Sequence, residues 1–278
     1  MAPQLTSLYT TSFLIALFVT LLVAACLRAI NILPGRTCHS AKAPRKAAPA
    51  TRILIVLGSG GHTHEMFHLL RDLDTSRYTQ RTYIVSGGDA FSAQRAVEFE
   101  QTLEDRASET RNKATTVRRR GTERPLCVGA EHFNIATIPR ARKIHQSLLT
   151  TPFTSLVTLV SAFSPLFRSD RLHPNLPPTT PYEIAAQDLP DLIITNGPAT
   201  GVIVVLAALI AKFFNLKGCS SRSKCRTIYV ESFARVKTLS LSAKLLAGVV
   251  DRFLVQWEEL EGEGGYVGGH AEYWGILV

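Results

Sequence analysis

The stretch that decides the fold is RILIVLGSGGHTHEM, residues 52–66. Its first six residues form a short apolar run with β-branched side chains, which is typical of a buried parallel strand. The run enters the turn Gly58-Ser59-Gly60-Gly61, where glycine permits positive φ angles and close approach of the backbone. A helix over residues 63–73 is predicted to follow. A strand, a tight glycine turn and a helix are the opening unit of a parallel α/β sheet.

The same alternation continues along the chain. Further strands are predicted at 82–85, 133–138, 192–195, 227–230 and 252–256, with helices at 199–214 and 240–249. Strands that alternate with helices predict a Rossmann-like α/β domain over residues 52–278, with a parallel sheet covered by helices on both faces. Two inserts interrupt it, a charged helix with a flexible segment near 90–130 and a proline-rich loop near 168–188. The apolar stretch 153–167 packs on the core or lies on a membrane, and its periodicity does not separate these.

One transmembrane anchor is predicted over residues 1–33. The run FLIALFVTLLVAACL at 13–27 has no charged residue, and its flanks extend it toward the roughly 20 residues that cross a bilayer. Arg28 and Arg36 follow it and no basic residue precedes it, so the positive-inside rule places the domain in the cytosol and the N-terminus in the lumen. A cleaved signal peptide is the alternative, but it normally begins with a positive region. Residues 34–51 form a basic linker.

Charge and cysteines narrow the classes of function. The net charge is +9, yet six of the 31 basic residues lie between 28 and 52 without any acid, which leaves 25 basic against 22 acidic residues elsewhere. The basic stretch 111–124 has no interleaved aromatic side chain, so nucleic-acid binding is not expected. The five cysteines are odd in number and lack CxxC spacing, which argues against a disulfide framework or a structural zinc site and fits a reducing compartment.

Polar and glycine-rich residues follow four of the predicted strands, at 58–65, 86–89, 196–200 and 231–235. In open α/β sheets the carboxyl ends of the strands form the ligand crevice, so four loops point to one site. The glycine loop before a helix N-terminus suits an anion such as a diphosphate, although a tight structural turn accounts for it equally well.

Three features admit two functions each. The sequence His64-Glu65-Met66-Phe67-His68 matches the zinc-peptidase pattern HExxH, but no third ligand follows nearby. Arg140 and Arg142 clamp phosphate oxygens or solvate a loop. Glu231 is a base or hydroxyl-orienting acid, or it caps a helix.

Four motifs taken together resemble one family. They are GSGGHTHEM at 58–66, IPRARKIHQS at 138–147, DLIITNGPATG at 191–201 and YVESFARVKTLSLSAKLL at 229–246. The chain resembles the membrane-anchor subunit of the eukaryotic UDP-N-acetylglucosamine (UDP-GlcNAc) transferase that adds the second GlcNAc to dolichol diphosphate-GlcNAc. The resemblance covers nearly all of residues 52–278 apart from the two inserts. Ala199 departs from it, because a glycine is expected after Asn-Gly-Pro.

The resemblance implies the acceptor-binding half of a type B, inverting glycosyltransferase at the endoplasmic reticulum membrane. Its partners would be a soluble UDP-GlcNAc-binding catalytic subunit and the lipid diphosphate acceptor, with residues 273–278 as a candidate contact with that subunit. No cofactor or obligatory metal is implied. The alternative is a scaffold that only recruits the soluble transferase.

The candidate site combines this resemblance with the strand-end pattern. His62, as the base, and Glu231 are the catalytic candidates. The candidates for binding the acceptor and its diphosphate are Gly58, Ser59, Gly60, Gly61, Thr63, Glu65, Arg140, Arg142, Asn196, Gly197, Pro198, Thr200, Ser232 and Arg235.

Overall fold

A seven-stranded parallel sheet forms the centre of the computed structural model, which describes residues 2–34, 50–116, 126–142, 146–147, 149–167, 180–264 and 271–277. The strands are β1 (Arg52–Val56), β2 (Gln80–Ser86), β3 (Phe133–Ile138), β4 (Leu192–Thr195), β5 (Arg226–Val230), β6 (Arg252–Val255) and β7 (Ala271–Tyr273), in the order β3-β2-β1-β4-β5-β6-β7. All neighbours pair in parallel, and Ile55 of β1 lies beside Tyr83 of β2 and Ile194 of β4. The predicted parallel α/β architecture is confirmed.

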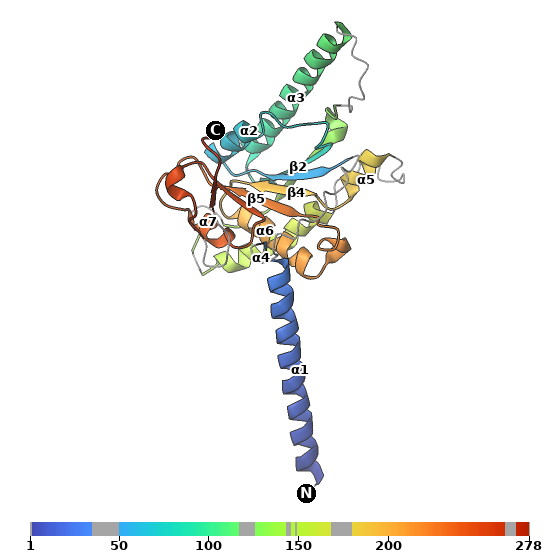
Figure 1. Ribbon diagram of the computed structural model, residues 1–278, viewed down its shortest axis with the longest axis vertical. Helices are drawn as coiled ribbons and strands as arrows, with labels where there is room; N and C mark the ends of the chain where they lie inside the picture. The colour runs from blue at the N-terminus through green and yellow to red at the C-terminus, as the bar shows by residue number, and fades with distance from the viewer. Residues whose placement is uncertain are drawn as a thin grey trace.

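Helices cover both faces of the sheet (Figure 1). The α-helices are α1 (Ala2–Ile32), α2 (Gly61–Leu69), α3 (Ala90–Thr116), α4 (Thr151–Phe167), α5 (Pro181–Gln187), α6 (Thr200–Phe213) and α7 (Leu241–Leu246), and the 3-10 turns are η1 (Ala130–His132), η2 (Leu216–Gly218) and η3 (Glu258–Leu260). Successive strand side chains point to opposite faces. Leu54 and Val56 therefore pack against α4 and α6, whereas Ile53 and Ile55 pack against α2 and α3.

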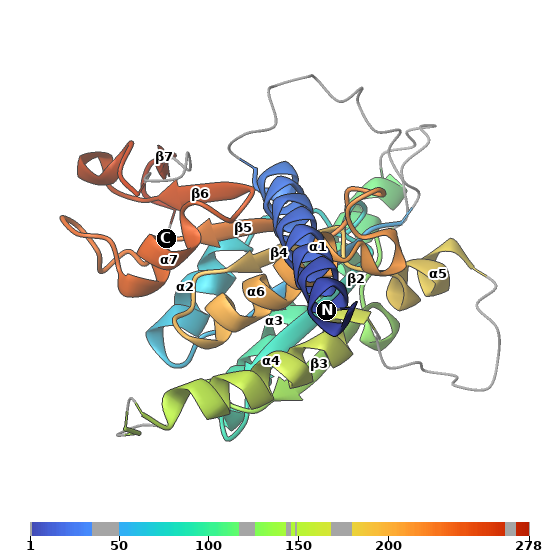
Figure 2. The ribbon, with the colours of Figure 1, turned by 90° about the horizontal axis from the view of Figure 1, so that it is seen from below.

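The N-terminal helix α1 extends away from the domain, on the side covered by α4 and α6 (Figures 1 and 2). Its segment Tyr9–Ile32 is long and apolar enough to cross a membrane. At its domain end, Arg28 donates from Nε to the carbonyl of Phe213 and from Nη2 to that of Lys212, at 3.0 and 2.8 Å. Because these are the last carbonyls of α6, Arg28 ties the anchor helix to the C-terminus of a core helix.

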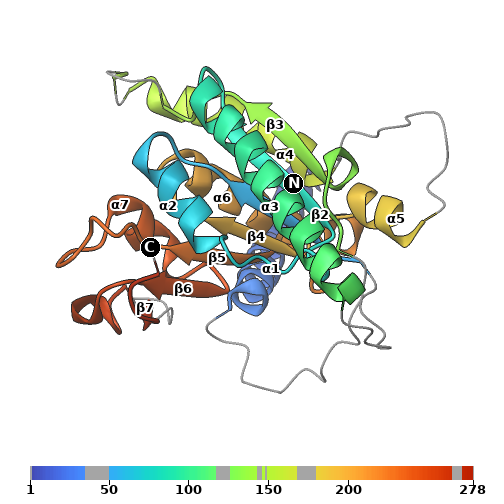
Figure 3. The same cartoon turned by 90° about the horizontal axis from the view of Figure 1, so that it is seen from above.

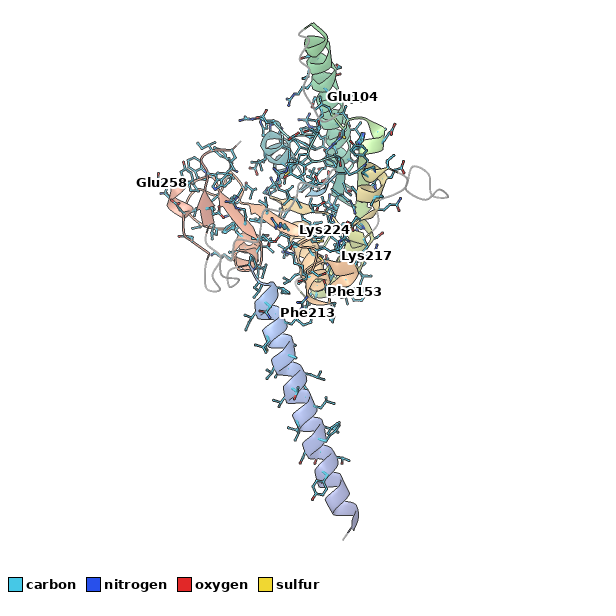
Figure 4. The ribbon with its side chains drawn as sticks, turned by 45° about the vertical axis from the view of Figure 1, so that its right-hand side comes forward. Glu104, Phe153, Phe213, Lys217, Lys224 and Glu258 are labelled. Atoms are coloured by element: carbon cyan, nitrogen blue, oxygen red, sulfur yellow. The ribbon has the colours of Figure 1, made fainter. Side chains whose placement is uncertain are left out.

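Helix α4 has one face in the core and one in solvent. Ala162 and Leu166 are buried, whereas Phe153 and Val160 are 72% and 65% exposed. The labelled Phe153 and Phe213 lie at the end of the domain from which α1 extends, while Glu104 of α3 lies on the opposite side (Figure 4). The apolar stretch 153–167, for which the sequence left two alternatives open, is thus part of a helix that packs on the sheet. It also presents exposed apolar side chains on the side from which α1 extends.

The elements in the two inserts agree with the prediction in part. Helix α3 is the helix expected in the first insert; it runs unbroken for 27 residues, and its second half projects beyond the sheet (Figures 1 and 3). Within the second insert, Thr180 and Glu183 form a capping box that starts α5, which was not predicted. The three-residue β7 was also missed. Residues 35–49, 117–125 and 168–179, in the predicted linker and inserts, lie outside the described residues.

Candidate active site

The loops after β1 and β4 touch at two glycines. A β-carbon on Gly197 would lie 3.1 Å from Cα of Gly58, and one on Gly58 would lie only 2.6 Å from Cβ of His62. Side chains cannot be accommodated at such distances without moving the backbone. Glycine at both positions thus lets the first loop lie directly against the Asn196 loop. Gly60, at the N-cap of α2, has a φ of 60°, which explains a second glycine in the turn.

Thr63 supports the glycine loop from behind. Its side chain is fully buried, and its hydroxyl donates to the carbonyl of Gly58 and lies 2.7 Å from the hydroxyl of Ser92 on α3. Its backbone N–H is taken by the carbonyl of Gly60 at 3.2 Å. Both polar groups are therefore used inside the protein. The structure gives Thr63 a supporting role, and its binding of the acceptor diphosphate stays a prediction.

A cluster of four side chains joins the ends of three elements. Asn196, after β4, donates from Nδ2 to the carbonyl of His62 at 2.8 Å and to Oε2 of Glu65 at 3.3 Å. Ser232, after β5, donates its hydroxyl to Oε1 of Glu65 at 2.9 Å. Nδ1 of His62 lies 3.6 Å from Oε2 of Glu65. The strand-end loops predicted to meet do so here.

Two polar atoms of this cluster have no partner. Across the described residues, Nδ1 of His62 and Oδ1 of Asn196 are the buried side-chain nitrogen and oxygen atoms that lack a hydrogen bond. Buried polar atoms are nearly always paired, and exceptions concentrate where a ligand or a reaction uses them. Both exceptions lie at the carboxyl ends of β1 and β4.

The carboxyl group of Glu65 is ionised at neutral pH. Burial by itself raises the pKa of Glu65, but His62 and the hydrogen bonds from Ser232 and Asn196 outweigh it, so the pKa is lowered from 4.5. The charge faces the cluster rather than solvent, because the side chain is only 16% exposed. Glu65 was predicted to bind the acceptor, and the structure instead engages both of its oxygens with protein groups.

Glu231 lies below the surface of the crevice. It is 1% exposed, and its carboxylate accepts the backbone N–H groups of Ser232 and Ser240, each at 3.0 Å. Ser240 is the N-cap of α7. Of the two functions that the sequence left open, this geometry is that of a residue that holds the loop and the helix start. A catalytic role of Glu231 stays a prediction, which this geometry does not support.

The remaining candidates lie around this cluster. Arg140 is half-buried and donates from Nε to the carbonyl of Gly87 at 3.0 Å, whereas Arg142 is exposed and donates to the carbonyl of Gln146. Thr200, at the start of α6, lies 2.9 Å from the hydroxyl of Ser86, so the β2 loop joins the same edge. Ser59, Gly60, Gly61, Pro198 and Arg235 are exposed.

Two supporting residues were missed. The hydroxyl of Ser92 donates to Oδ2 of Asp89 at 2.8 Å and lies 3.1 Å from the carbonyl oxygen of Gly58, so Ser92 joins the β1 and β2 loops. Asp89 lies in a loop that the sequence singled out, but Ser92 carried no signal because it lies inside a predicted helix.

The zinc-peptidase pattern is not assembled as a catalytic site. His64 and His68 are exposed, with their Nε2 atoms 3.1 Å apart, whereas Glu65 is turned toward Asn196 and Ser232. In the described part of the chain, no group of three or more His, Cys, Asp or Glu side chains is placed to hold a metal ion. The glutamate that would act as the base is thus already engaged elsewhere.

Solved structures with a similar arrangement include MurG of Acinetobacter baumannii, at 12% identity and a TM-score of 0.40 over 81% of this chain and 45% of that chain. A second is UGT89C1 of Arabidopsis thaliana complexed with UDP, at 12% identity and a TM-score of 0.38 over 82% of this chain and 53% of that chain. The chain thus spans about half the length of these two proteins.

Sequence relatives extend over most of the chain. The family described as "Oligosaccharide biosynthesis protein Alg14 like" matches residues 53–277. The protein named UDP-N-acetylglucosamine transferase subunit alg14 is 41% identical in Aspergillus fumigatus, over 77% of this chain and all of that protein. The relative of that name in Schizosaccharomyces pombe is 34% identical over 94% of this chain and 99% of its own, and the human relative is 30% identical over 89% and 88%. The chain belongs to the Alg14 family.

Proposed function

We propose that this chain is the membrane-anchored, acceptor-binding subunit of an inverting UDP-GlcNAc transferase that adds the second GlcNAc to dolichol diphosphate-GlcNAc. Relatives over nearly the whole chain are named as subunits of a UDP-GlcNAc transferase, which supports this assignment. The observation that carries it in the structure is Oδ1 of Asn196, a buried atom without a hydrogen bond, which lies beside a glycine loop and a helix N-terminus.

The diphosphate binds at the glycine loop in this proposal. Helix α2 begins at Gly61, and the first N–H groups of a helix have no intrahelical acceptor. Together with the positive end of the helix dipole they favour an anion. Ser59, Gly60 and Gly61 are exposed, so phosphate oxygens can approach their backbone.

His62 acts as the base. The acceptor 4-hydroxyl gives its proton to the imidazole as its oxygen attacks the anomeric carbon of the donor GlcNAc, and the bond from that carbon to UDP breaks. An imidazole suits the step because its neutral form has one ring nitrogen without a proton, which can accept the proton of the hydroxyl. Oδ1 of Asn196, which has no partner in the protein, accepts a hydrogen bond from the acceptor sugar.

The donor is held by a second, soluble chain that closes the crevice. The candidate contact segment 273–278 begins at Tyr273, the last residue of the edge strand β7, and Trp274 and Ile276 are 54% and 59% exposed, which supports a contact with that chain there. In this proposal the domain lies on the cytosolic face of the endoplasmic reticulum and the N-terminus of α1 lies in the lumen, in keeping with Arg28 at the domain end of the span.

Substitution of His62 separates this function from that of a scaffold without a catalytic role. His62→Ala in the complex reconstituted with the UDP-GlcNAc-binding chain is expected to reduce transfer by about 10²- to 10⁴-fold, the usual contribution of a general base, while the two chains still co-purify. The exposed His68→Ala is the matched control and is expected to leave transfer unchanged. Full activity of His62→Ala would refute the assignment of His62 as the base. If other substitutions in the strand-end loops also left transfer unchanged while the two chains still co-purified, the result would favour the scaffold.

A further inference from the structure

Glu65 is held in a fixed position directly behind His62. Ser232 donates to one of its oxygens at 2.9 Å and Asn196 to the other at 3.3 Å. The residues that hold it follow β4 and β5, whereas Glu65 itself lies on α2. A carboxylate anchored from two strands cannot rotate freely. It is also one helical turn from His62, a spacing that places the two side chains on the same face.

The imidazole of His62 is buried on one edge. Nδ1 is shielded from solvent and lies 3.6 Å from Oε2 of Glu65, while the side chain as a whole is 32% exposed. A neutral imidazole has one donor and one acceptor nitrogen. With a carboxylate facing Nδ1, the favourable tautomer carries its proton there, which leaves Nε2 as the basic nitrogen. Catalytic hydrogen bonds are often long without substrate and tighten when it binds.

We propose that Glu65, held by Ser232 and Asn196, is a positioning residue that fixes the Nδ1–H tautomer and the orientation of His62. This inference rests on the proposed function in that it assigns Glu65 a part in the same reaction. Glu65, the glutamate of the HExxH pattern, thus acts through His62, the histidine three residues before it. Glu65 does not touch the acceptor.

The other charged and polar groups near His62 and Glu65 have other partners or are exposed. Glu231, at the end of β5, has both carboxylate oxygens bonded to backbone N–H groups. Arg235 is exposed on the same loop, and Tyr229 beneath the cluster interacts electrostatically with Glu65, Glu231 and Arg235. From α3, the hydroxyl of Ser92 is bonded to Asp89. Glu65 is therefore the carboxylate that faces Nδ1 of His62 among these groups.

Glu65→Gln in the full chain, reconstituted with its UDP-GlcNAc-binding partner, tests the inference. It keeps the shape of the side chain and removes its charge. Turnover is expected to fall about 10- to 100-fold, part of the effect of a general base, with the KM for the lipid acceptor unchanged. A variant with a raised KM and unchanged turnover would show that Glu65 binds the acceptor directly, and would overturn the inference. Glu98→Gln, on the exposed part of α3, is the control.

Two further measurements keep the result independent of the proposed base. Adding Glu65→Gln to His62→Ala is expected to cause no further loss, because residues that act as a unit are not additive. Nitrogen-15 NMR of labelled histidine reports the tautomer of His62 without any assay, and Glu65→Gln is expected to reduce the Nδ1–H form. An unchanged tautomer would overturn the inference, whereas an active His62→Ala would overturn only the base. Ser232→Ala removes only the hydroxyl that donates to Glu65. It is expected to shift the tautomer of His62 and the turnover in the same direction as Glu65→Gln, but by a smaller amount. This variant tests the inference if Glu65→Gln does not fold.

Discussion

At position 58 there is no room for a β-carbon. The added β-carbon in Gly58→Ala would lie 2.6 Å from Cβ of His62, which is not the flexible end of a side chain. Either the loop or His62 must move. The glycine is therefore required for the position of the proposed base as well as for the turn.

Gly58→Ala is expected to lower transfer activity more than about tenfold, because small displacements of catalytic groups are costly. The free energy of unfolding should fall by about 1–3 kcal/mol, as for other overpacked sites. Gly61→Ala is the stability control, since its methyl group would meet nothing within 4 Å. Thermal unfolding in detergent and the transfer assay check both effects. If the two variants were equally stable and equally active, the close approach would not matter.

Ala199 has a backbone conformation that favours glycine. It precedes α6 with a φ of 48° and a ψ of −74°, a conformation that L-residues rarely adopt. A glycine is expected here from the resemblance, and the backbone explains why glycine fits better. The strain lies in the Asn196 loop, beside the site.

At the scale of elements, the anchor and the domain are joined by a defined contact. Arg28 is half-buried and bonds the last two carbonyls of α6, while α6 packs against the sheet. Hydrogen bonds from a charged donor are among the stronger ones. The orientation of the domain on its span is therefore set by structure at the end of α1. Helix α4 lies on the same side (Figure 2).

Arg28→Gln is expected to leave the chain in the membrane but reduce transfer to a bilayer-embedded acceptor about tenfold, because the crevice is no longer held toward the lipid. Transfer to a short-chain, water-soluble acceptor should be unchanged. Arg36→Gln removes the same charge beside the same span and is the control. An equal loss of transfer with both substitutions would show that the positive charge, and not the contact between Arg28 and α6, is responsible.

Helices and strands with strong apolar patterns could be predicted, and short or capped ones could not. Strands β1 to β6 and helix α6 were located within a few residues because buried parallel strands are continuous apolar runs. Strand β7 has three residues, too few for a pattern, and α5 depends on the local cap at Thr180. The four converging loops were predicted because polar and glycine-rich residues follow strands of a parallel sheet, whose carboxyl ends meet at one edge. The direction of Glu65 was not, because it depends on Ser232, 167 residues away.

At the scale of the whole molecule, the domain offers one wall of a crevice. The described residues contain one parallel sheet, with the glycine loop, the Asn196 loop and the Ser232 loop at its carboxyl edge. In the proposed function a second chain brings the donor to this wall. In the same proposal, α1 keeps this wall beside the bilayer that holds the lipid acceptor.

The most direct test is transfer of GlcNAc to dolichol diphosphate-GlcNAc in vesicles, measured with this chain alone, with the soluble UDP-GlcNAc-binding chain alone, and with both. The account predicts product only when both chains are present. Rapid transfer by this chain in isolation, or by the soluble chain without it, would contradict the account.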